Sequence, residues 1–147
     1  MTIISDFMQK DHVDIDAIAE RATNAAAAGD AATMAKEGAE FLKRLRLHID
    51  QEEKLLFPAF EERTGMREGG PRVQMKMEHD DMRPIIEQMH AAVAAKDAAT
   101  YQRASKALFD ILVPHNQKEE QMMYPMLDDT MGAEAGALLA EVKAMAA

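Results

Sequence analysis

Two stretches of this sequence carry the same order of histidine, glutamate and proline. The first runs from His48 to Pro58 and reads H-I-D-Q-E-E-K-L-L-F-P, and the second runs from His115 to Pro125 and reads H-N-Q-K-E-E-Q-M-M-Y-P. Each contains a histidine, three further residues, two consecutive glutamates and an aromatic residue before the proline. Imidazole nitrogens and carboxylate oxygens are common metal ligands, so metal binding is the chemistry that this repeat can support.

Each stretch is preceded, 36 residues upstream, by another histidine that directly follows an acidic residue. These are Asp11-His12 in the first half of the chain and Glu78-His79 in the second. Equivalent positions in the two halves share one offset of 67 residues: His12/His79, His48/His115, Glu52/Glu119 and Pro58/Pro125. A register kept at so many positions indicates two similar helical hairpins, each with two imidazoles and one carboxylate.

The spacing of four between histidine and glutamate suits one face of a helix. Residues i and i+4 lie about 6 Å apart on a helix, so His48 and Glu52 can reach one metal centre together, as can His115 and Glu119. The pattern therefore predicts that each hairpin presents a histidine and a glutamate side by side.

The other two histidines, His12 and His79, would reach the centre from two further helices. By the symmetry of the repeat, the two histidines of each hairpin would bind one metal ion, and Glu52 and Glu119 would bridge the two ions. Bridging carboxylates let two cations approach within roughly 3.5–4 Å because they offset the mutual repulsion. These donors suit iron, manganese or zinc and do not choose among them.

Apolar residues accompany these ligands at helical spacing. The residues that share a face are Phe41, Leu45, His48, Ile49, Glu52, Leu55 and Leu56 in one segment, and Ala104, Leu108, Ile111, His115, Glu119 and Met122 in the other. The histidines and glutamates are therefore expected to point into a core. A buried carboxylate without a partner costs on the order of several kcal/mol or stays protonated, and a cation would supply the partner.

Helices are expected to position all of these residues, because the chain is rich in Ala and Met and poor in Gly and Pro. The expected helices cover residues 5–28, 31–57, 71–95, 101–124 and 133–146, with a loop at 64–70 between the halves. Ser5 or Asp6 would cap the first helix and Asp97 the fourth. Pro58, Pro84 and Pro114 are expected to bend their helices. The predicted fold is all-α, with four antiparallel helices and a short extra C-terminal helix.

Length and composition narrow the functional classes. The 147 residues fit one domain, 1–147, and the net charge of −9 argues against a nucleic-acid or anionic membrane surface. The absence of cysteine excludes disulfides, thiolate catalysis and Cys-ligated metal sites. The N-terminus does not read as a secretion signal, and no apolar run approaches the ~20 residues of a membrane helix, so a cytoplasmic protein is expected.

Acidic residues near the ligands have less definite roles. Glu53 and Glu120 lie about 100° round the helix from the proposed bridges, and they are predicted to be solvated or to support the ligands from behind, with ligation as an alternative. Asp11 and Glu78 are predicted to be surface acids or helix-face charges rather than ligands. Asp16, four residues after His12, is an alternative ligand or orienting partner.

Three further predictions concern packing and solvent exposure. Phe57 and Tyr124 occupy equivalent positions and are expected to pack at the bundle end, with a Tyr124 hydrogen bond near the metals as the alternative. The methionines are expected to fill gaps between helices. Asp128 and Asp129 are expected to be solvated.

Together these motifs resemble the hemerythrin-like family, also described as the HHE cation-binding domain, over His12 to Pro125. The resemblance implies an up-down four-helix bundle with a non-haem di-iron centre, which agrees with the bundle expected above. It implies four terminal histidine ligands and two bridging glutamates, namely His12, His48, His79, His115, Glu52 and Glu119. It also implies O2 binding, O2 or redox sensing, nitric oxide or peroxide chemistry, or iron homeostasis.

One departure from the family pattern limits these implications. Oxygen-carrying hemerythrins have a fifth histidine in a His-x3-His pair, and here the residue four before His79 is Met75. Solvent or another side chain is expected to fill that position, or it stays open, which counts against simple reversible O2 carriage. His90 would lie about 16 Å from His79 along the helix axis, too far to replace the ligand.

The leading hypothesis is a non-haem di-iron protein that binds or reacts with O2 or a related small oxidant. Two histidines and two bridging oxygens on each iron leave room for a bridging oxide or hydroxide and a small ligand, and manganese or zinc are alternative metals. The alternatives are a metal-dependent regulatory or iron-homeostasis module, which a protein partner or a homodimer would read, and a peroxidase- or catalase-like enzyme.

Overall fold

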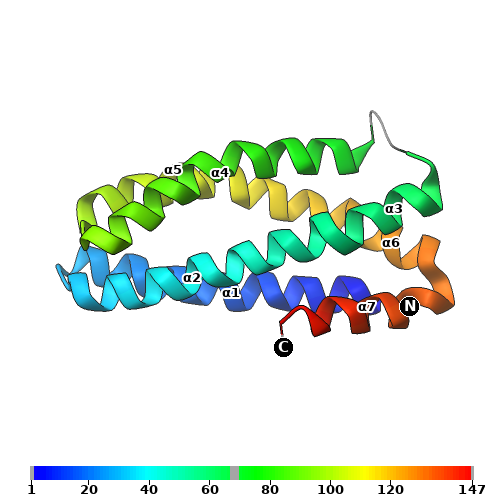
Figure 1. Ribbon diagram of the computed structural model, residues 1–147, viewed down its shortest axis with the longest axis horizontal. Helices are drawn as coiled ribbons and strands as arrows, with labels where there is room; N and C mark the ends of the chain where they lie inside the picture. Colours follow the sequence, from blue (N-terminus) through cyan, green and yellow to red (C-terminus); the bar gives the residue numbers. More distant parts are fainter. Residues whose placement is uncertain (1, 67–69, 147) are drawn as a thin grey trace.

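The computed structural model describes residues 2–66 and 70–146, and nearly all of them are helical, with no β-strand in these two ranges. Four long helices lie side by side along the longest axis (Figure 1). They are α1 (Ile3–Ala27), α2 (Ala31–Gln51), α4 (Pro71–Ala95) and α5 (Ala98–Lys118). α1 packs on α2 and α4 on α5, and contacts between α2 and α4 and between α1 and α5 close the bundle. The predicted all-α, up-down four-helix bundle is confirmed.

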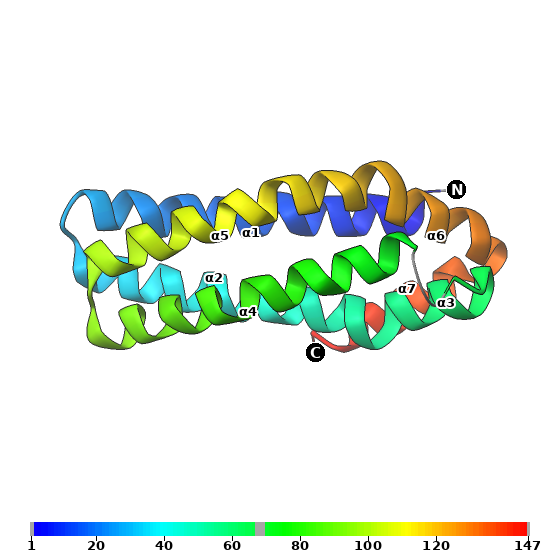
Figure 2. The ribbon, with the colours of Figure 1, turned by 90° about the horizontal axis from the view of Figure 1, so that it is seen from above.

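The two hairpins turn at the same end of the bundle, as Figure 2 shows. Gly29 has a φ of 76° in the first turn, and Asp30 then caps α2 by accepting a hydrogen bond from the Thr33 N–H at 3.1 Å. Asp97 caps α5 in the same way through the Thr100 N–H, also at 3.1 Å. The sequence predicted both breaks, and the predicted cap at Asp97 is confirmed, with α5 beginning at Ala98.

α2 and α5 do not end at Glu52 and Glu119. Each widens into one π-helical turn and then continues. The π turns are Glu52–Leu56 and Glu119–Met123, and they lead into α3 (Phe57–Thr64) and α6 (Tyr124–Met131). The chain therefore stays helical through both motifs.

Each π turn is followed by an aromatic residue and a proline. A proline alone does not impose such a turn, since Pro84 and Pro114 lie inside α4 and α5. It has no N–H, however, and its ring crowds the carbonyl four residues earlier, which disfavours an ordinary helical turn. The residue just before the proline instead bonds five residues back: the Phe57 N–H to the Glu52 carbonyl, and the Tyr124 N–H to the Glu119 carbonyl. Such wide turns are frequent at functional sites.

The π turns change which side chains face the core. An α-helical period predicts Leu55 and Met122 inside, but Leu55 is only partly buried and Met122 is 39% exposed. Because a π turn brings residue i+5 back over residue i, Phe57 and Tyr124 are buried instead, with exposures of 1% and 0%. The predicted inward position of Met122 is therefore wrong.

Apolar side chains fill the bundle on both sides of a buried polar layer. Towards the hairpin turns the core includes Ile15, Leu45, Ile49, Met82, Leu108 and Leu112. Towards the opposite end it includes Ile4, Met8, Leu56, Phe57, Met75, Met123 and Tyr124. Between them lie the buried His12, His48, Glu52, His79, His115 and Glu119. The polar layer is thus sealed along the bundle axis.

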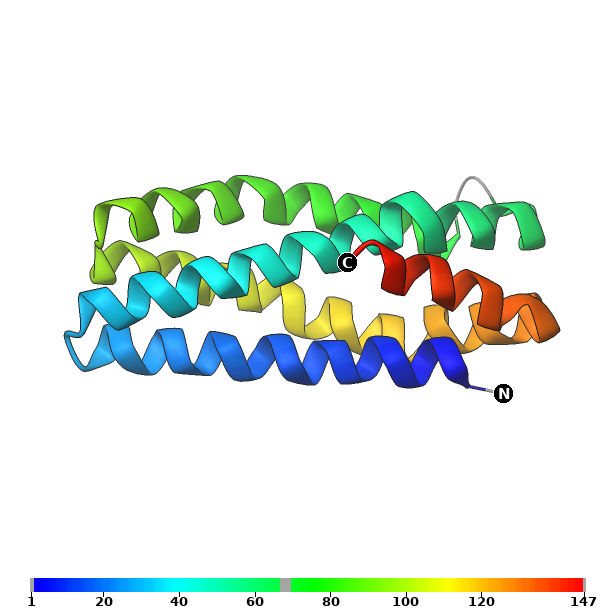
Figure 3. The ribbon, with the colours of Figure 1, turned by 60° about the horizontal axis from the view of Figure 1, so that its bottom comes forward.

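A short C-terminal helix covers the second apolar cluster, as predicted. A 3₁₀ turn, Gly132–Glu134, leads into α7 (Ala135–Ala144), which runs back along the bundle and packs against α1 and the first π turn (Figure 3). Gln51 Nε2 donates a hydrogen bond of 3.0 Å to the Val142 carbonyl. This contact ties α7 to the helix that leads into the site.

The start of α1 is capped from a distant part of the chain. The Asp128 carboxylate accepts hydrogen bonds from the Ile4 N–H, the Ser5 N–H and the Ser5 hydroxyl at 2.9, 2.9 and 2.7 Å. Asp128 is buried, so the prediction that it is solvated is wrong, whereas Asp129 is exposed. The predicted cap at Ser5 or Asp6 is also wrong, because α1 already begins at Ile3.

Part of the predicted loop at 64–70, residues 67–69, lies outside the described residues. Pro84 and Pro114 both lie inside their helices. Among the residues described, no helix combines the length and the apolar character that crossing a membrane requires.

We predict that Asp128→Ala lowers the free energy of unfolding by about 2–3 kcal/mol, because three buried donors at the start of α1 lose their acceptor. The midpoint of thermal unfolding should fall by roughly 5–10 °C. The control is Asp129→Ala, an exposed neighbour, which should change stability by less than about 0.5 kcal/mol. Equal effects of the two substitutions would contradict this assignment.

Candidate metal centre

The four repeated histidines meet in the core as two pairs. His12 of α1 and His48 of α2 bring their Nε2 atoms to 3.0 Å, and His79 of α4 and His115 of α5 bring theirs to 3.2 Å. We call these the His12 pair and the His79 pair. None of these four residues is more than 4% exposed. Each hairpin thus contributes one pair, as the repeat predicts.

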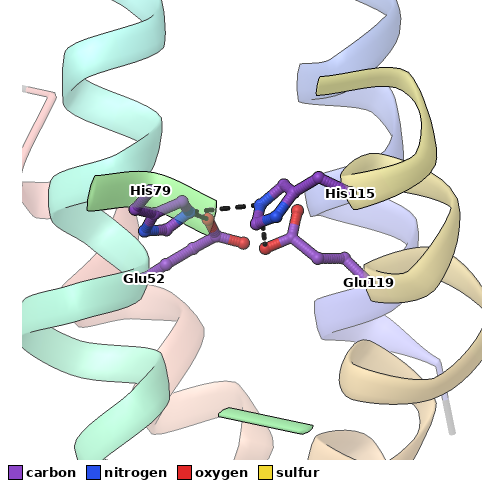
Figure 4. Close-up of side chains that lie close together, drawn as sticks. All are labelled: Glu52, His79, His115 and Glu119. Atoms are coloured by element: carbon purple, nitrogen blue, oxygen red, sulfur yellow. Dashed lines mark hydrogen bonds and ion pairs between the residues drawn. The ribbon is translucent and has the colours of Figure 1, made fainter. Parts of the chain in front are cut away.

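Glu52 and Glu119 lie between the two pairs, and each carboxylate faces one histidine from each pair. Glu52 Oε1 is 3.1 Å from His79 Nε2, and its Oε2 is 3.7 Å from His48 Nε2. Glu119 Oε1 is 3.3 Å from His12 Nε2, and its Oε2 is 3.3 Å from His115 Nε2. Figure 4 shows Glu52 and His79 pointing toward His115 and Glu119, which lie on successive turns of one continuous helix.

The ligand atoms form two groups that could each hold a metal ion. One contains Glu52, His79, His115 and Glu119, and the other contains His12, His48 and Glu119, with the donor atoms of each group within 4.8 Å of one another. Glu119 belongs to both groups. The six residues that the sequence singled out are therefore all in one buried layer.

A carboxylate lies behind every histidine of the site. Asp11 is 2.7 Å from His48 Nδ1, and Glu78 is 2.8 Å from His115 Nδ1. The prediction that Asp11 and Glu78 are surface acids is wrong, because each lies one residue before a histidine on α1 or α4 and turns toward the histidine of the adjacent helix. Sequence reasoning missed this role, although the acid-histidine order in both halves was visible.

The other two histidines receive their carboxylates from the opposite half of the chain. Glu53 Oε2 is 2.8 Å from His79 Nδ1, and Glu120 Oε2 is 2.7 Å from His12 Nδ1. Glu53 and Glu120 thus support the histidines from behind, which is one of the two roles predicted for them. These contacts connect the first π turn to α4 and the second π turn to α1.

These carboxylates fix which nitrogen of each ring faces inward. A neutral imidazole that donates its Nδ1 proton to a carboxylate presents the lone pair of Nε2. Two such lone pairs face each other at about 3 Å in each pair, which is repulsive unless a proton or a cation lies between them. Glu52 Oε1 and Glu119 Oε2 are also buried without a hydrogen-bond partner among the described residues. The donor set therefore fits a bound cation.

In the absence of metal, protons can take the place of that cation. Burial lowers the pKa of His12 and of His115, but hydrogen bonding and charge from Glu119 outweigh it and raise each pKa to about 9. Burial and the charge of Glu119 raise the pKa of Glu52. Burial acts in the same direction on Glu119, yet hydrogen bonds from Glu52 and the histidines hold its pKa well below its usual range.

Tyr124 brings a hydroxyl group into only one half of the site. Its oxygen lies 3.3 Å from His12 Nε2 and 3.2 Å from His48 Nε2, and it donates toward Glu52 Oε2 at 2.7 Å or Glu119 Oε1 at 3.0 Å. The equivalent residue in the other half, Phe57, stacks on the His79 ring with a centroid distance of 5.5 Å. Tyr124 therefore does more than pack at the bundle end, and the alternative, a hydrogen bond beside the buried polar layer, is what the structure has. The π turn places its hydroxyl there.

The remaining candidates lie away from the ligand groups. Met75 is fully buried in the apolar cluster beside the site, at the position where oxygen carriers have their fifth histidine. His90 is exposed and lines a surface hollow between α2 and α4. Asp16 is exposed and belongs to neither ligand group, although the charges of His12 and Glu120 act on it.

We predict that the metal-free protein becomes less stable as pH rises from about 6.5 to 9. The folded-state pKa values of His12 and His115 lie above the unfolded value of 6.5, so their contribution is complete below pH 6.5 and is lost as pH passes 9. The loss should be on the order of 3 kcal/mol per histidine at most. Denaturant unfolding in a chelator across this range measures it, and stability that is constant or rising would contradict the prediction.

Comparisons with known proteins agree with this geometry. A scan against protein-family models matched the hemerythrin HHE cation binding domain over residues 3–127, which includes all six inner histidines and glutamates. No curated protein and no solved structure matched the chain. The match covers most of the sequence, and we conclude that the chain belongs to the hemerythrin HHE cation-binding domain family.

Proposed function

We propose that this protein holds two iron ions between its histidine pairs and binds or reacts with O2 or a related small oxidant. The observation that carries the proposal is the placement of Glu52 and Glu119, each of which faces one histidine of each pair. A carboxylate in that position can bridge two cations. Family membership supports a cation as the ligand, and the mixed nitrogen and oxygen donors support iron.

The side chains of the site would serve this function in three ways. The carboxylates behind the rings hold all four Nε2 lone pairs inward. The inner glutamates supply the negative charge that keeps two cations close together. The apolar clusters on either side exclude water from the layer. Iron would supply the electron transfer that none of these side chains can perform.

Each histidine pair supplies only two nitrogens, so coordination positions are left for a small ligand. The Tyr124 oxygen approaches both histidines of the His12 pair, and Phe57 occupies the equivalent place beside the His79 pair. These contacts support Tyr124 as a further ligand of the ion at the His12 pair. The ion at the His79 pair would then be the more open one, and there we expect the oxidant to bind.

We further propose one domain over residues 1–147 and a cytoplasmic location.

We predict that His79→Ala reduces the bound iron from two ions per chain to about one, because one histidine of a pair is lost. After anaerobic loading with iron(II), metal analysis counts the ions, and admission of air should then produce near-ultraviolet charge-transfer absorption in the wild type. The matched control is His90→Ala, the same substitution on the exposed part of α4.

The control should keep two ions and the full spectral change. Equal iron content in the two variants would contradict the ligand assignment. Two bound ions in the wild type with no spectral change in air would contradict the reaction with O2 and leave the metal site standing.

We predict that oxidised, iron-loaded protein has a visible phenolate-to-iron(III) absorption band, and that Tyr124→Phe removes it. The control is Tyr101→Phe, because Tyr101 is equally buried but lies in the other apolar cluster. A band that survives in Tyr124→Phe, or one that Tyr101→Phe removes, would contradict the role of Tyr124.

A further inference from the structure

The four carboxylates behind the histidines are not equally anchored. Arg44 binds Asp11 with an N–O distance of 2.8 Å, Lys118 forms an ion pair with Glu78, and Arg83 contacts Glu53 through two hydrogen bonds. Three of the four carboxylates that bond to a histidine are therefore anchored by a basic side chain on their outer side.

Glu120 is the exception. Among the residues that the structure describes, no basic side chain contacts it, and its only polar contact is with His12. Its side chain is 36% exposed, compared with 15% for Asp11 and 18% for both Glu53 and Glu78. The His12 corner of the site is thus the least anchored and the most accessible to solvent.

The repeat shows how the difference arises. Glu120 corresponds to Glu53, and at the same offset of 67 residues Asp16 corresponds to Arg83. Where one half places a guanidinium beside its outer carboxylate, the other half places a second carboxylate. Asp16 lies one helical turn after His12, close enough for the charges of His12 and Glu120 to act on it. The exposed corner formed by His12, Asp16 and Glu120 is therefore acidic, while the equivalent corner is neutralised.

This corner leads to buried ligands. Behind His12 lies Glu119, which is fully buried. Its Oε1 is 3.3 Å from His12 Nε2 and accepts a hydrogen bond from Tyr124, while its Oε2 faces His115 and has no hydrogen-bond partner among the described residues. On the outer side, a groove of about 340 Å³ runs between α1 and α5, and its lining includes Asp16, Glu20, Lys106 and Phe109. A cation that reaches Glu120 would thus be separated from the Glu119 carboxylate only by the His12 ring.

We propose that metal ions reach the site through the corner of His12, Asp16 and Glu120. This inference rests on the proposed metal binding. Asp16 and Glu120 attract the hydrated cation, and Glu120 exchanges its bond to His12 for a contact with the ion. The His12 ring, no longer bonded to Glu120, then rotates away and returns to its place once the ion has passed. The other three corners each present a positive side chain, which repels a cation and holds its carboxylate in place.

The test compares the rate of metal uptake in two charge-reversal variants. Cobalt(II) is mixed with metal-free full-length chain at low ionic strength, and its visible absorption follows binding in a stopped-flow instrument. Asp16→Arg imitates Arg83 and should slow uptake roughly tenfold, with the effect shrinking at high salt. The control, Asp14→Arg, makes the same charge change on the side of α1 toward α2, and it should slow uptake less than about twofold.

Both variants should finally bind as much cobalt as the wild type, because neither residue belongs to the ligand groups. Unchanged uptake in Asp16→Arg, or an equal slowing in both variants, would overturn the route while leaving the proposed function intact. A wild type that takes up no cobalt would overturn both. If Asp16→Arg fails to fold, Asp16→Asn should slow uptake roughly threefold, and an unchanged rate there would overturn the route as well.

Discussion

The pairing of each imidazole Nδ1 with a carboxylate is the constraint on which the site depends. A histidine ring in a helical bundle can rotate about its side-chain bonds. Without a hydrogen-bond partner at one ring nitrogen, neither the orientation nor the tautomer of a buried ring is fixed. Here Asp11, Glu53, Glu78 and Glu120 each hold one ring at 2.7–2.8 Å. All four Nε2 lone pairs consequently face inward, where only a positive charge makes their closeness favourable.

That constraint also connects the fold to the site. The contacts behind the rings join α1 to α2 and α4 to α5 within the hairpins. Between the hairpins they join the first π turn to α4 and the second π turn to α1. The polar layer therefore touches every long helix, and a cation inside it would stabilise the whole bundle. The apolar clusters at both ends make the layer dry, which strengthens every charge interaction within it.

Much of this arrangement follows from the sequence, because helical periodicity and the 67-residue repeat predict the helices and bring the six inner histidines and glutamates together. The π turns did not follow, because the α-helical period was extended through Glu52 and Glu119. That extension placed Met122 inside and left Tyr124 as packing. The prolines six residues after each glutamate were a partial signal, since proline disfavours an ordinary helical turn, although Pro84 and Pro114 lie inside α-helices. The role of Asp128 depends on a contact between distant parts of the chain, which no local pattern reveals.

The near-symmetry of the halves makes their differences informative. Tyr124 stands opposite Phe57, and Asp16 stands opposite Arg83, so both departures gather at the His12 pair. The His79 pair thus has the Phe57 ring on its inner side and the Arg83 guanidinium on its outer side. The His12 pair instead has the Tyr124 hydroxyl inside and the carboxylates of Asp16 and Glu120 outside. Two ions held here would experience different surroundings even though their histidines are equivalent.

Anomalous diffraction at the iron absorption edge, from crystals of the iron-loaded full chain, tests the central claim most directly. It should show two peaks in the buried layer, one beside His12 and His48 and the other beside His79 and His115, roughly 3.5–4 Å apart. Iron found only at surface carboxylates, with no peak between the histidine pairs, would contradict the account.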